Sequence, residues 1–278
     1  VSSDNQTLKI ATEELQMGLK GLLNKKIAII KTATSAGGIL LNVNKNAPSN
    51  ANLSNEGFEI YTEKGNIVIS SKSETGVLYG VFELLRAIQT GKSLAKLSIT
   101  SSPKVKIRML NHWDNANGTV ERGYAGSSMW KWNELPHRID PRYVMYARAN
   151  ASIGINATSI NNVNASSRFL TAEYLEKIKA VADVLRPYGI KVFISVNFRS
   201  PRTLGGLKTS DPLDPEVRKW WSEKTKEIHQ YIPDFGGYLV KANSEGEPGP
   251  QDYGRTHADG ANMLAEAMRP FSGIVIWR

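Results

Sequence analysis

The 278-residue chain contains no cysteine. It therefore has no disulfide scaffold, zinc ribbon, cysteine nucleophile or iron–sulfur centre. Long apolar runs are also absent, and none approaches the ~18 consecutive apolar residues of a membrane-spanning helix. The four histidines show no HxH or HExxH spacing, and no phosphate-binding loop or GxSxG motif occurs. The sequence thus predicts neither a metal nor an organic cofactor, and no membrane span.

Hydrophobic residues make up 41% of the chain and charged residues 22%, which is typical of a folded domain with a sizeable core. The formal net charge is +9, a field that attracts anions of any kind. The basic residues are scattered, without the runs or basic arms of nucleic-acid-binding proteins, so no nucleic-acid partner is predicted. The polar start VSSDNQT predicts an internal or already processed N-terminus, and the compartment stays open. Sequons at Asn156 and Asn164 fall at expected strand ends, where glycans would obstruct the fold, which favours a bacterial source.

The first hundred residues mix short helices and strands, and the pattern changes near Ser101–Pro103. Apolar residues at helical spacing predict two helices, and β-branched runs predict strands. The expected elements are helices at Ala11–Leu23 and Val77–Gln89, strands at Lys26–Lys31, Ile39–Val43 and Ala95–Thr100, and a hairpin at Phe58–Ser71. Residues 1–102 are therefore predicted to form a small α+β domain.

From residue 103 onward, short apolar strands alternate with amphipathic helices, a pattern typical of a parallel sheet. The expected strands are Lys106–Trp113, Asn156–Val163, Ile190–Phe198, Gly237–Asn243 and Gly273–Arg278. The helices between them are expected at Pro141–Ser152, Ala172–Leu185, Glu216–Tyr231 and His257–Met268.

Polar residues follow these strands, at 111–114, 161–162, 197 and 243–245. A (β/α)8 barrel builds its active site from such strand ends. An open doubly wound sheet is the alternative, but no Gly-rich loop follows the first strand. The predicted fold class is α/β, a partial TIM barrel over residues 103–278 that contains strands 1–5 of the eight. An open half-barrel would leave unpaired strand edges, so we expect the rest of the barrel to follow residue 278.

Glu245 comes just beyond the fourth barrel strand, where a side chain can point into the mouth. Aromatic walls there would raise the pKa of its carboxyl group and let it act as a general acid. Glu247 is a rival two residues later, in a Gly/Pro-rich loop. The alternative for both is a solvated loop glutamate. Position alone leaves these interpretations open.

Two cations accompany Glu245 at the expected strand ends. Lys241 lies four residues earlier and shares its side of a strand, and Arg278 ends the next strand. Together they suit the binding of a carboxylate. The alternatives are a lysine buried against a structural carboxylate and a surface arginine.

Aromatic residues supply a further candidate surface. His112 and Trp113 end the first barrel strand and suit a platform under a sugar, although a tryptophan there is more often part of a core. Trp130 and Trp132, in the following loop, are candidates for a lid. Asn162, at the end of the second strand, is a further candidate for substrate binding.

Several long runs closely resemble the α-glucuronidases of glycoside hydrolase family 67, over most of residues 76–278. These runs are NHWDN (111–115), ERGYAG (121–126), ASIGIN (151–156), NNVNA (161–165), RPYGIK (186–191), TSDPLDPEV (209–217), YIPDFGGYLVKANSEGEPGP (231–250), YGRTHADGANML (253–264) and GIVIWR (273–278). The stretch ETGVLYGVFELLRAIQ (74–89) also resembles the small domain that precedes such barrels and those of β-hexosaminidases.

The resemblance implies inverting hydrolysis of the α-1,2 bond between (4-O-methyl)glucuronic acid and xylose in oligosaccharides derived from glucuronoxylan. It implies that Glu245 is the general acid, that Lys241 and Arg278 line the uronic acid pocket, and that Trp113 and Val163 form its apolar wall. The general base of the family lies on later barrel strands, beyond residue 278. A homodimer is implied only for a full-length protein, because the helical region that commonly forms the interface also lies beyond this point.

Three classes of function remain at this stage. A xylan-degrading glycosidase accounts for the set Lys241, Glu245 and Arg278. A non-catalytic carbohydrate-binding protein predicts aromatic platforms without an acid in a pocket. A nucleic-acid-binding protein needs a basic stripe and binding that depends on salt, and the sequence lacks such a stripe.

Overall fold

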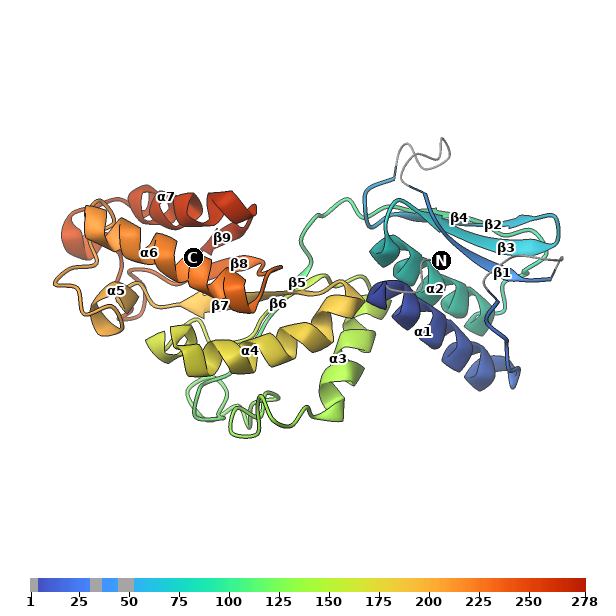
Figure 1. Ribbon diagram of the computed structural model, residues 1–278, viewed down its shortest axis with the longest axis horizontal. Helices are drawn as coiled ribbons and strands as arrows, with labels where there is room; N and C mark the ends of the chain where they lie inside the picture. The colour runs from blue at the N-terminus through green and yellow to red at the C-terminus, as the bar shows by residue number, and fades with distance from the viewer. Residues whose placement is uncertain (1–4, 31–36, 45–52) are drawn as a thin grey trace. The chain divides into compact units, whose positions relative to one another are not determined.

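The computed structural model describes residues 5–30, 37–44 and 53–278, which form two compact units (Figure 1). Unit 1 consists of Val1–Arg108, Met145–Ile155 and Arg186–Gly189. Unit 2 consists of Met109–Val144, Asn156–Leu185 and Ile190–Arg278. Two short segments from later in the sequence thus complete the first unit.

Unit 1 contains a four-stranded sheet with the order β1-β3-β2-β4. Its strands are β1 (Ile39–Val43), β2 (Phe58–Glu63), β3 (Asn66–Ser71) and β4 (Ser98–Ser101). The predicted hairpin is confirmed, since β2 and β3 pair antiparallel around the turn at residues 64–65. Helix α2 (Glu74–Gln89) packs against β2 and β3, and α1 (Gln6–Leu23) packs against α2. The unit is therefore the predicted α+β arrangement.

Both helices of unit 1 begin earlier than their apolar patterns predict, because polar residues cap them. The side chain of Asn5 accepts a hydrogen bond from the backbone N–H of Leu8, and Ser73 accepts one from Gly76. Gly80 lets α2 approach the sheet, since a Cβ atom there would lie 2.5 Å from a methyl carbon of Ile69.

The expected strand Lys26–Lys31 is wrong for the described residues 26–30, which have no regular structure. Lys31 lies outside the described residues. Ile29 and Ile30 are 61% and 66% exposed, and among the described residues no strand pairs with this apolar run. A β-branched run forms a strand only where another strand completes its hydrogen bonds.

Unit 2 is built on a five-stranded parallel sheet with the order β5-β6-β7-β8-β9. Its strands are β5 (Met109–Asn111), β6 (Ala157–Ser159), β7 (Lys191–Val196), β8 (Gly237–Val240) and β9 (Ile274–Trp277). The order never reverses, so the sheet has no topological switch point and the doubly wound alternative is wrong. The predicted partial barrel is confirmed.

Helices cover the outer side of this sheet. Parallel strands in sequential order with right-handed crossovers place every connecting helix on one face. The main helices are α3 (Pro141–Ser152), α4 (Ala172–Leu185), α6 (Pro215–Tyr231) and α7 (His257–Met268), with short helices α5 (Ser200–Thr203), η2 (Ser167–Leu170), η3 (Arg186–Tyr188), η4 (Pro250–Tyr253) and η5 (Arg269–Phe271). Helix α6 packs against both α4 and α7. The opposite face of the sheet is left for the interior of the barrel.

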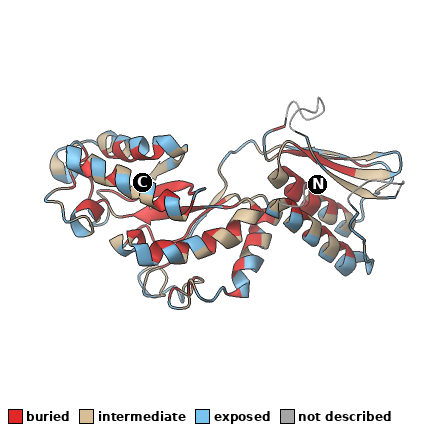
Figure 2. Ribbon diagram, viewed as in Figure 1, coloured by how far each residue is buried: buried red, intermediate tan, exposed pale blue. Residues whose placement is uncertain are grey.

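The core of unit 2 follows the central strands. Residues 192–196 of β7 and all of β8 are buried, as Figure 2 shows. The first two barrel strands are shorter than predicted, three residues each. The chain leaves the ladder after Asn111 and Ser159, and four of the candidate site residues lie in the turns beyond these points: His112, Trp113, Asn162 and Val163.

Candidate active site

Lys241 directly follows β8, at the carboxyl end of the sheet, and Glu245 lies in the loop that comes next. Asn243 and Glu245 both have left-handed backbone conformations, with φ of 48° and 52°. These two bends turn the chain back on itself. As a result, the ammonium group of Lys241 donates a hydrogen bond to Oε2 of Glu245.

The two partners of this ion pair differ sharply in exposure. The side chain of Lys241 is 1% exposed, whereas that of Glu245 is 54% exposed. The second acceptor of Lys241 is Oδ1 of Asn164, at 2.8 Å. A buried ammonium is therefore satisfied by one internal amide and by one carboxylate that faces solvent.

The electrostatics of Glu245 differ from the expectation. The hydrogen bond and charge of Lys241 lower the pKa of Glu245, and the charges of Arg122 and Arg278 act in the same direction. The expected rise in this pKa is thus wrong for the unliganded protein, because the buried cation outweighs desolvation. Glu245 is ionised at neutral pH, and a general acid must first take up a proton.

Arg278 and Trp113 meet although their strands lie at opposite edges of the sheet. Four strand spacings would place β5 and β9 roughly 19 Å apart in a flat sheet. The guanidinium carbon of Arg278 is nevertheless 5.6 Å from the centre of the Trp113 ring, within the range of a cation–π contact. The sheet therefore curls, and both side chains face the same mouth.

Asn162 is placed differently from the other candidates. Its amide donates to Oδ1 of Asn115 at 3.0 Å and to the carbonyl of Glu121 at 3.2 Å. Its carbonyl accepts from the backbone N–H of Asn164 at 2.9 Å. Asn162 thus holds the loop after β5 and positions Asn164, which reaches Lys241. Its neighbour Val163 is buried, 2% exposed.

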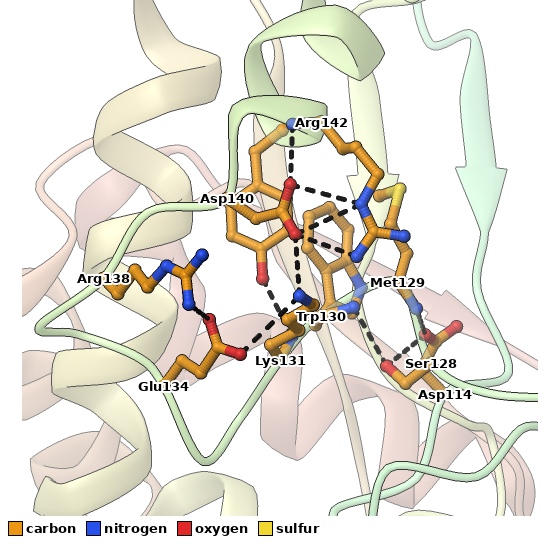
Figure 3. Close-up of polar contacts among 10 residues, drawn as sticks. Asp114, Ser128, Met129, Trp130, Lys131, Glu134, Arg138, Asp140 and Arg142 are labelled. Atoms are coloured by element: carbon orange, nitrogen blue, oxygen red, sulfur yellow. Dashed lines mark hydrogen bonds and ion pairs between the residues drawn. The ribbon is translucent and has the colours of Figure 1, made fainter.

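His112 and Asp114 form a pair at the end of β5. Nδ1 of His112 lies 3.3 Å from Oδ2 of Asp114. The other carboxylate oxygen of Asp114 accepts from the hydroxyl of Ser128 and from the backbone N–H of Met129 (Figure 3). Asp114 is 3% exposed, so both its oxygens serve to orient His112 and to anchor the loop. This geometry does not suit a free general base.

Trp130 and Trp132 do not form an exposed lid, because they are 1% and 3% exposed. Trp130 packs on His112 and on Tyr143, with ring centres 5.4 and 5.2 Å apart. The expectation was wrong because this loop folds its aromatic side chains inward. The indole rings bury more apolar area when they pack inside the unit than they would on a mobile lid.

A charged network fixes the same loop (Figure 3). Asp140 accepts hydrogen bonds from the guanidinium of Arg142 through both carboxylate oxygens, and the ammonium of Lys131 lies 3.2 Å from Oδ2 of Asp140. Arg142 holds the pKa of Asp140 well below its usual range. A cavity of about 690 Å³ lies beside this network. A second cavity, of about 300 Å³, is lined by Asn162, Asn164 and Phe169, among others.

Sequence reasoning missed two residues near Glu245. Arg122 lies in the ERGYAG run and adds a third positive charge. Asn164 accepts the hydrogen bond from Lys241. The signal available for Asn164 was its spacing of two from Asn162 in the run NNVNA. For Arg122 nothing in the local pattern pointed to a site. Within the described ranges, no group of three or more potential metal-ligating side chains occurs, and no helix has the length and apolarity to span a membrane.

The fold and the charged strand ends are typical of a TIM-barrel enzyme, and comparison with known proteins identifies the class as glycoside hydrolases. The model "Glycosyl hydrolase family 67 middle domain" matches residues 87–278, and "Glycosyl hydrolase family 67 N-terminus" matches residues 1–84. The chain is 41% identical to "Probable alpha-glucuronidase A" from Aspergillus terreus, with 100% of this chain and 34% of that protein covered. It is 40% identical to "Alpha-glucuronidase" from Hypocrea jecorina, with 100% of this chain and 35% of that protein covered. The chain belongs to glycoside hydrolase family 67.

Solved structures of other families share the fold. A GH138 enzyme that targets pectin rhamnogalacturonan II matches with a TM-score of 0.62 and 17% identity, over 100% of this chain and 46% of that one. A family GH115 4-O-methyl-alpha-glucuronidase matches with a TM-score of 0.63 and 14% identity, over 98% and 38%. At these identities the likeness concerns the fold alone. The chain spans about a third of the length of the curated relatives named above.

Proposed function

We propose that the chain forms the acid-bearing part of a xylan-degrading α-glucuronidase. The reaction is inverting hydrolysis of the α-1,2 link between (4-O-methyl)glucuronic acid and xylose in oligosaccharides from glucuronoxylan. One observation carries the proposal: two cations, Lys241 and Arg278, and one solvent-facing carboxylate, Glu245, gather at one sheet mouth beside Trp113. Relatives of which the chain covers about a third are named alpha-glucuronidases, which supports it.

The residues divide into recognition and chemistry. Lys241 and Arg278 bind the carboxylate of the uronic acid through charge-assisted hydrogen bonds. Trp113 and Val163 provide the apolar wall against the sugar ring, and His112, which is paired with Asp114, is a further binding residue at the end of β5. Asn162 acts by fixing the loops around this pocket. Glu245 donates a proton to the leaving oxygen.

An inverting hydrolase also needs a second carboxylate that activates water on the opposite face of the sugar. Glu247 is held by the amide of Asn197 at 2.8 Å, and Asp114 is engaged as described. We therefore place the general base outside residues 1–278. For the complete protein we also propose a homodimer, formed by a region that lies outside the third of the relatives that this chain matches.

The test of the acid role uses a protein with the complete barrel. Glu245→Gln should lower turnover of a glucuronic acid-bearing xylo-oligosaccharide by roughly 10²–10⁴-fold. The loss should be much smaller for an aryl glucuronide, whose leaving group needs little protonation. Glu247→Gln is the matched control and should keep most activity. Equal losses of Glu245→Gln on both substrates would contradict the assignment.

Residues 1–278 alone provide the complementary test. The isolated chain should not release glucuronic acid from the oligosaccharide, because water is not activated. Turnover close to that of the complete protein would show that a carboxylate within these residues is the base. The variants Asp114→Asn and Glu247→Gln would then identify which one.

A further inference from the structure

The ion pair between Lys241 and Glu245 poses a conflict between two roles. A carboxyl group that delivers a proton must be protonated at the moment of reaction. Glu245 instead accepts a hydrogen bond from the buried ammonium of Lys241, which favours its ionised form. The unliganded site is thus arranged for a carboxylate at this position rather than for a carboxylic acid.

The ammonium group of Lys241 is buried, which limits the hydrogen-bond acceptors within its reach. Its side chain is 1% exposed, and its ammonium group donates hydrogen bonds to Glu245 and Asn164. An ammonium group has three donors, so the number of donors alone does not prevent a second carboxylate from binding beside Asn164 and Glu245. Two carboxylates on the same ammonium repel each other, and the repulsion raises the pKa of one of them.

Glu245 is the partner that a ligand can displace from Lys241. Its side chain is 54% exposed, so solvent reaches the carboxyl group and can supply a proton. The groups that act electrostatically on it are Lys241, Arg122 and Arg278, all positive. A bound uronate neutralises Lys241 and Arg278 together, while Arg122 already lies 3.9 Å from the carboxylate of Glu121.

We infer that the carboxylate of the uronic acid displaces Glu245 from Lys241, so that Glu245 takes up a proton as the ligand binds. This inference rests on the proposed function. The proton comes from solvent and is held on Glu245 until it passes to the leaving glycosidic oxygen. The acid is therefore loaded only when an anionic sugar occupies the site, and a neutral sugar leaves Glu245 ionised and inactive.

The experiment measures the Glu245 carboxyl directly in a protein with the complete barrel. The side-chain carbonyl carbons of the glutamates are labelled with ¹³C, and Glu245 is assigned by comparison with Glu245→Gln. Titration with and without saturating D-glucuronate should show that its pKa rises by at least one unit when the ligand is bound. D-Glucose at the same concentration should leave the pKa unchanged.

Affinity gives an independent readout. Uptake of one proton makes the dissociation constant of glucuronate fall by up to tenfold for each pH unit of acidification, between the free and bound pKa of Glu245. Glu245→Gln should bind glucuronate more tightly than the wild type at pH 7, since Lys241 no longer has an internal carboxylate, and should lose this pH dependence. Glu247→Gln should keep the wild-type pH dependence.

The outcomes separate the two proposals. Binding of glucuronate with an unchanged Glu245 pKa would overturn this inference and leave the proposed function standing. Pronounced pH dependence that persists in Glu245→Gln would also overturn it, because the proton would then go to another group. Absence of glucuronate binding in the folded protein with the complete barrel would overturn the proposed function and the inference with it.

Discussion

Each unit contains a carboxylate paired with a buried or half-buried cation, and the two pairs are opposites. In unit 1, Glu14 is the buried partner, with 5% of its side chain exposed, while Arg148 is 38% exposed. Nε of Arg148 lies 2.7 and 2.8 Å from the two oxygens of Glu14, and the hydroxyl of Tyr188 donates to Oε1 at 3.1 Å. In unit 2 the cation Lys241 is buried and the carboxylate Glu245 is exposed.

The difference separates a structural ion pair from a functional one. Glu14 joins α1 to the two later segments of unit 1, and protein donors surround it. No ligand can replace it without opening the unit. The buried cation Lys241, by contrast, has one acceptor that solvent or a ligand can substitute. A buried charge with an exchangeable partner is a binding site, whereas a buried charge with fixed partners holds the fold together.

The largest expected effect is on ligand binding in unit 2. Lys241→Met should raise the dissociation constant of glucuronate by roughly 10–150-fold, which corresponds to the ~1.5–3 kcal/mol of a charge-assisted hydrogen bond. The stability of unit 2 should change little, because Glu245 is already exposed and Met has a similar volume. Calorimetric titration and thermal unfolding measure the two quantities.

The matched control for this variant is Lys224→Met. Lys224 is paired with Glu227 on α6, so its loss should leave glucuronate affinity unchanged. A large loss of stability in Lys241→Met with unaltered affinity would reverse the comparison, since Lys241 would then be the structural cation.

A smaller effect, on stability, is expected in unit 1. Glu14→Ala leaves Arg148 and Tyr188 without their acceptor and should reduce the local stability of unit 1 by about 1–3 kcal/mol. Hydrogen exchange of the α1 amides reports this opening without assuming that both units unfold together. Glucuronate affinity should not change.

Glu13→Ala is the control on the neighbouring position of α1. Glu13 lies 4.0 Å from Lys9, and both side chains are more than half exposed. Such a pair contributes roughly 0–1 kcal/mol. Similar exchange rates in Glu14→Ala and Glu13→Ala would show that the buried pair does not hold unit 1.

The smallest effect concerns pH. Burial, followed by the charge of Glu14, raises the pKa of Tyr188 to about 12, compared with about 10 in an unfolded chain. Below pH 10 the hydroxyl is protonated in both states and its stabilisation is complete. Between pH 10 and 12 the unfolded state loses the proton first, so stability falls. The free energy of unfolding of Tyr188→Phe, measured with urea, should fall less between these pH values than that of the wild type. An equal fall in the two proteins would exclude Tyr188 as a cause.

The fold of unit 2 could be predicted because its signals are local. Strands of apolar residues alternate with helices of period 3.6, and α4 and α7 have the bounds that their patterns predict. In unit 1 the starts of α1 and α2 were predicted less well. Asn5 and Ser73 cap these helices through hydrogen bonds, which a pattern of apolar residues does not reveal. The strand expected at Lys26–Lys31 failed because local β-propensity says nothing about a partner strand.

The sequence by itself determined the alternation of strands and helices, and with it the placement of Lys241, Glu245 and Arg278 at strand ends. Only the tertiary structure decided which of these charges is buried and which carboxylate holds it. Asn164 binds Lys241 across 77 positions of sequence. Two left-handed residues fold the loop so that Glu245 reaches the same ammonium. The protonation of Glu245 follows from these contacts, because a pKa depends on the charges that the folded chain brings near and not on the order of residues.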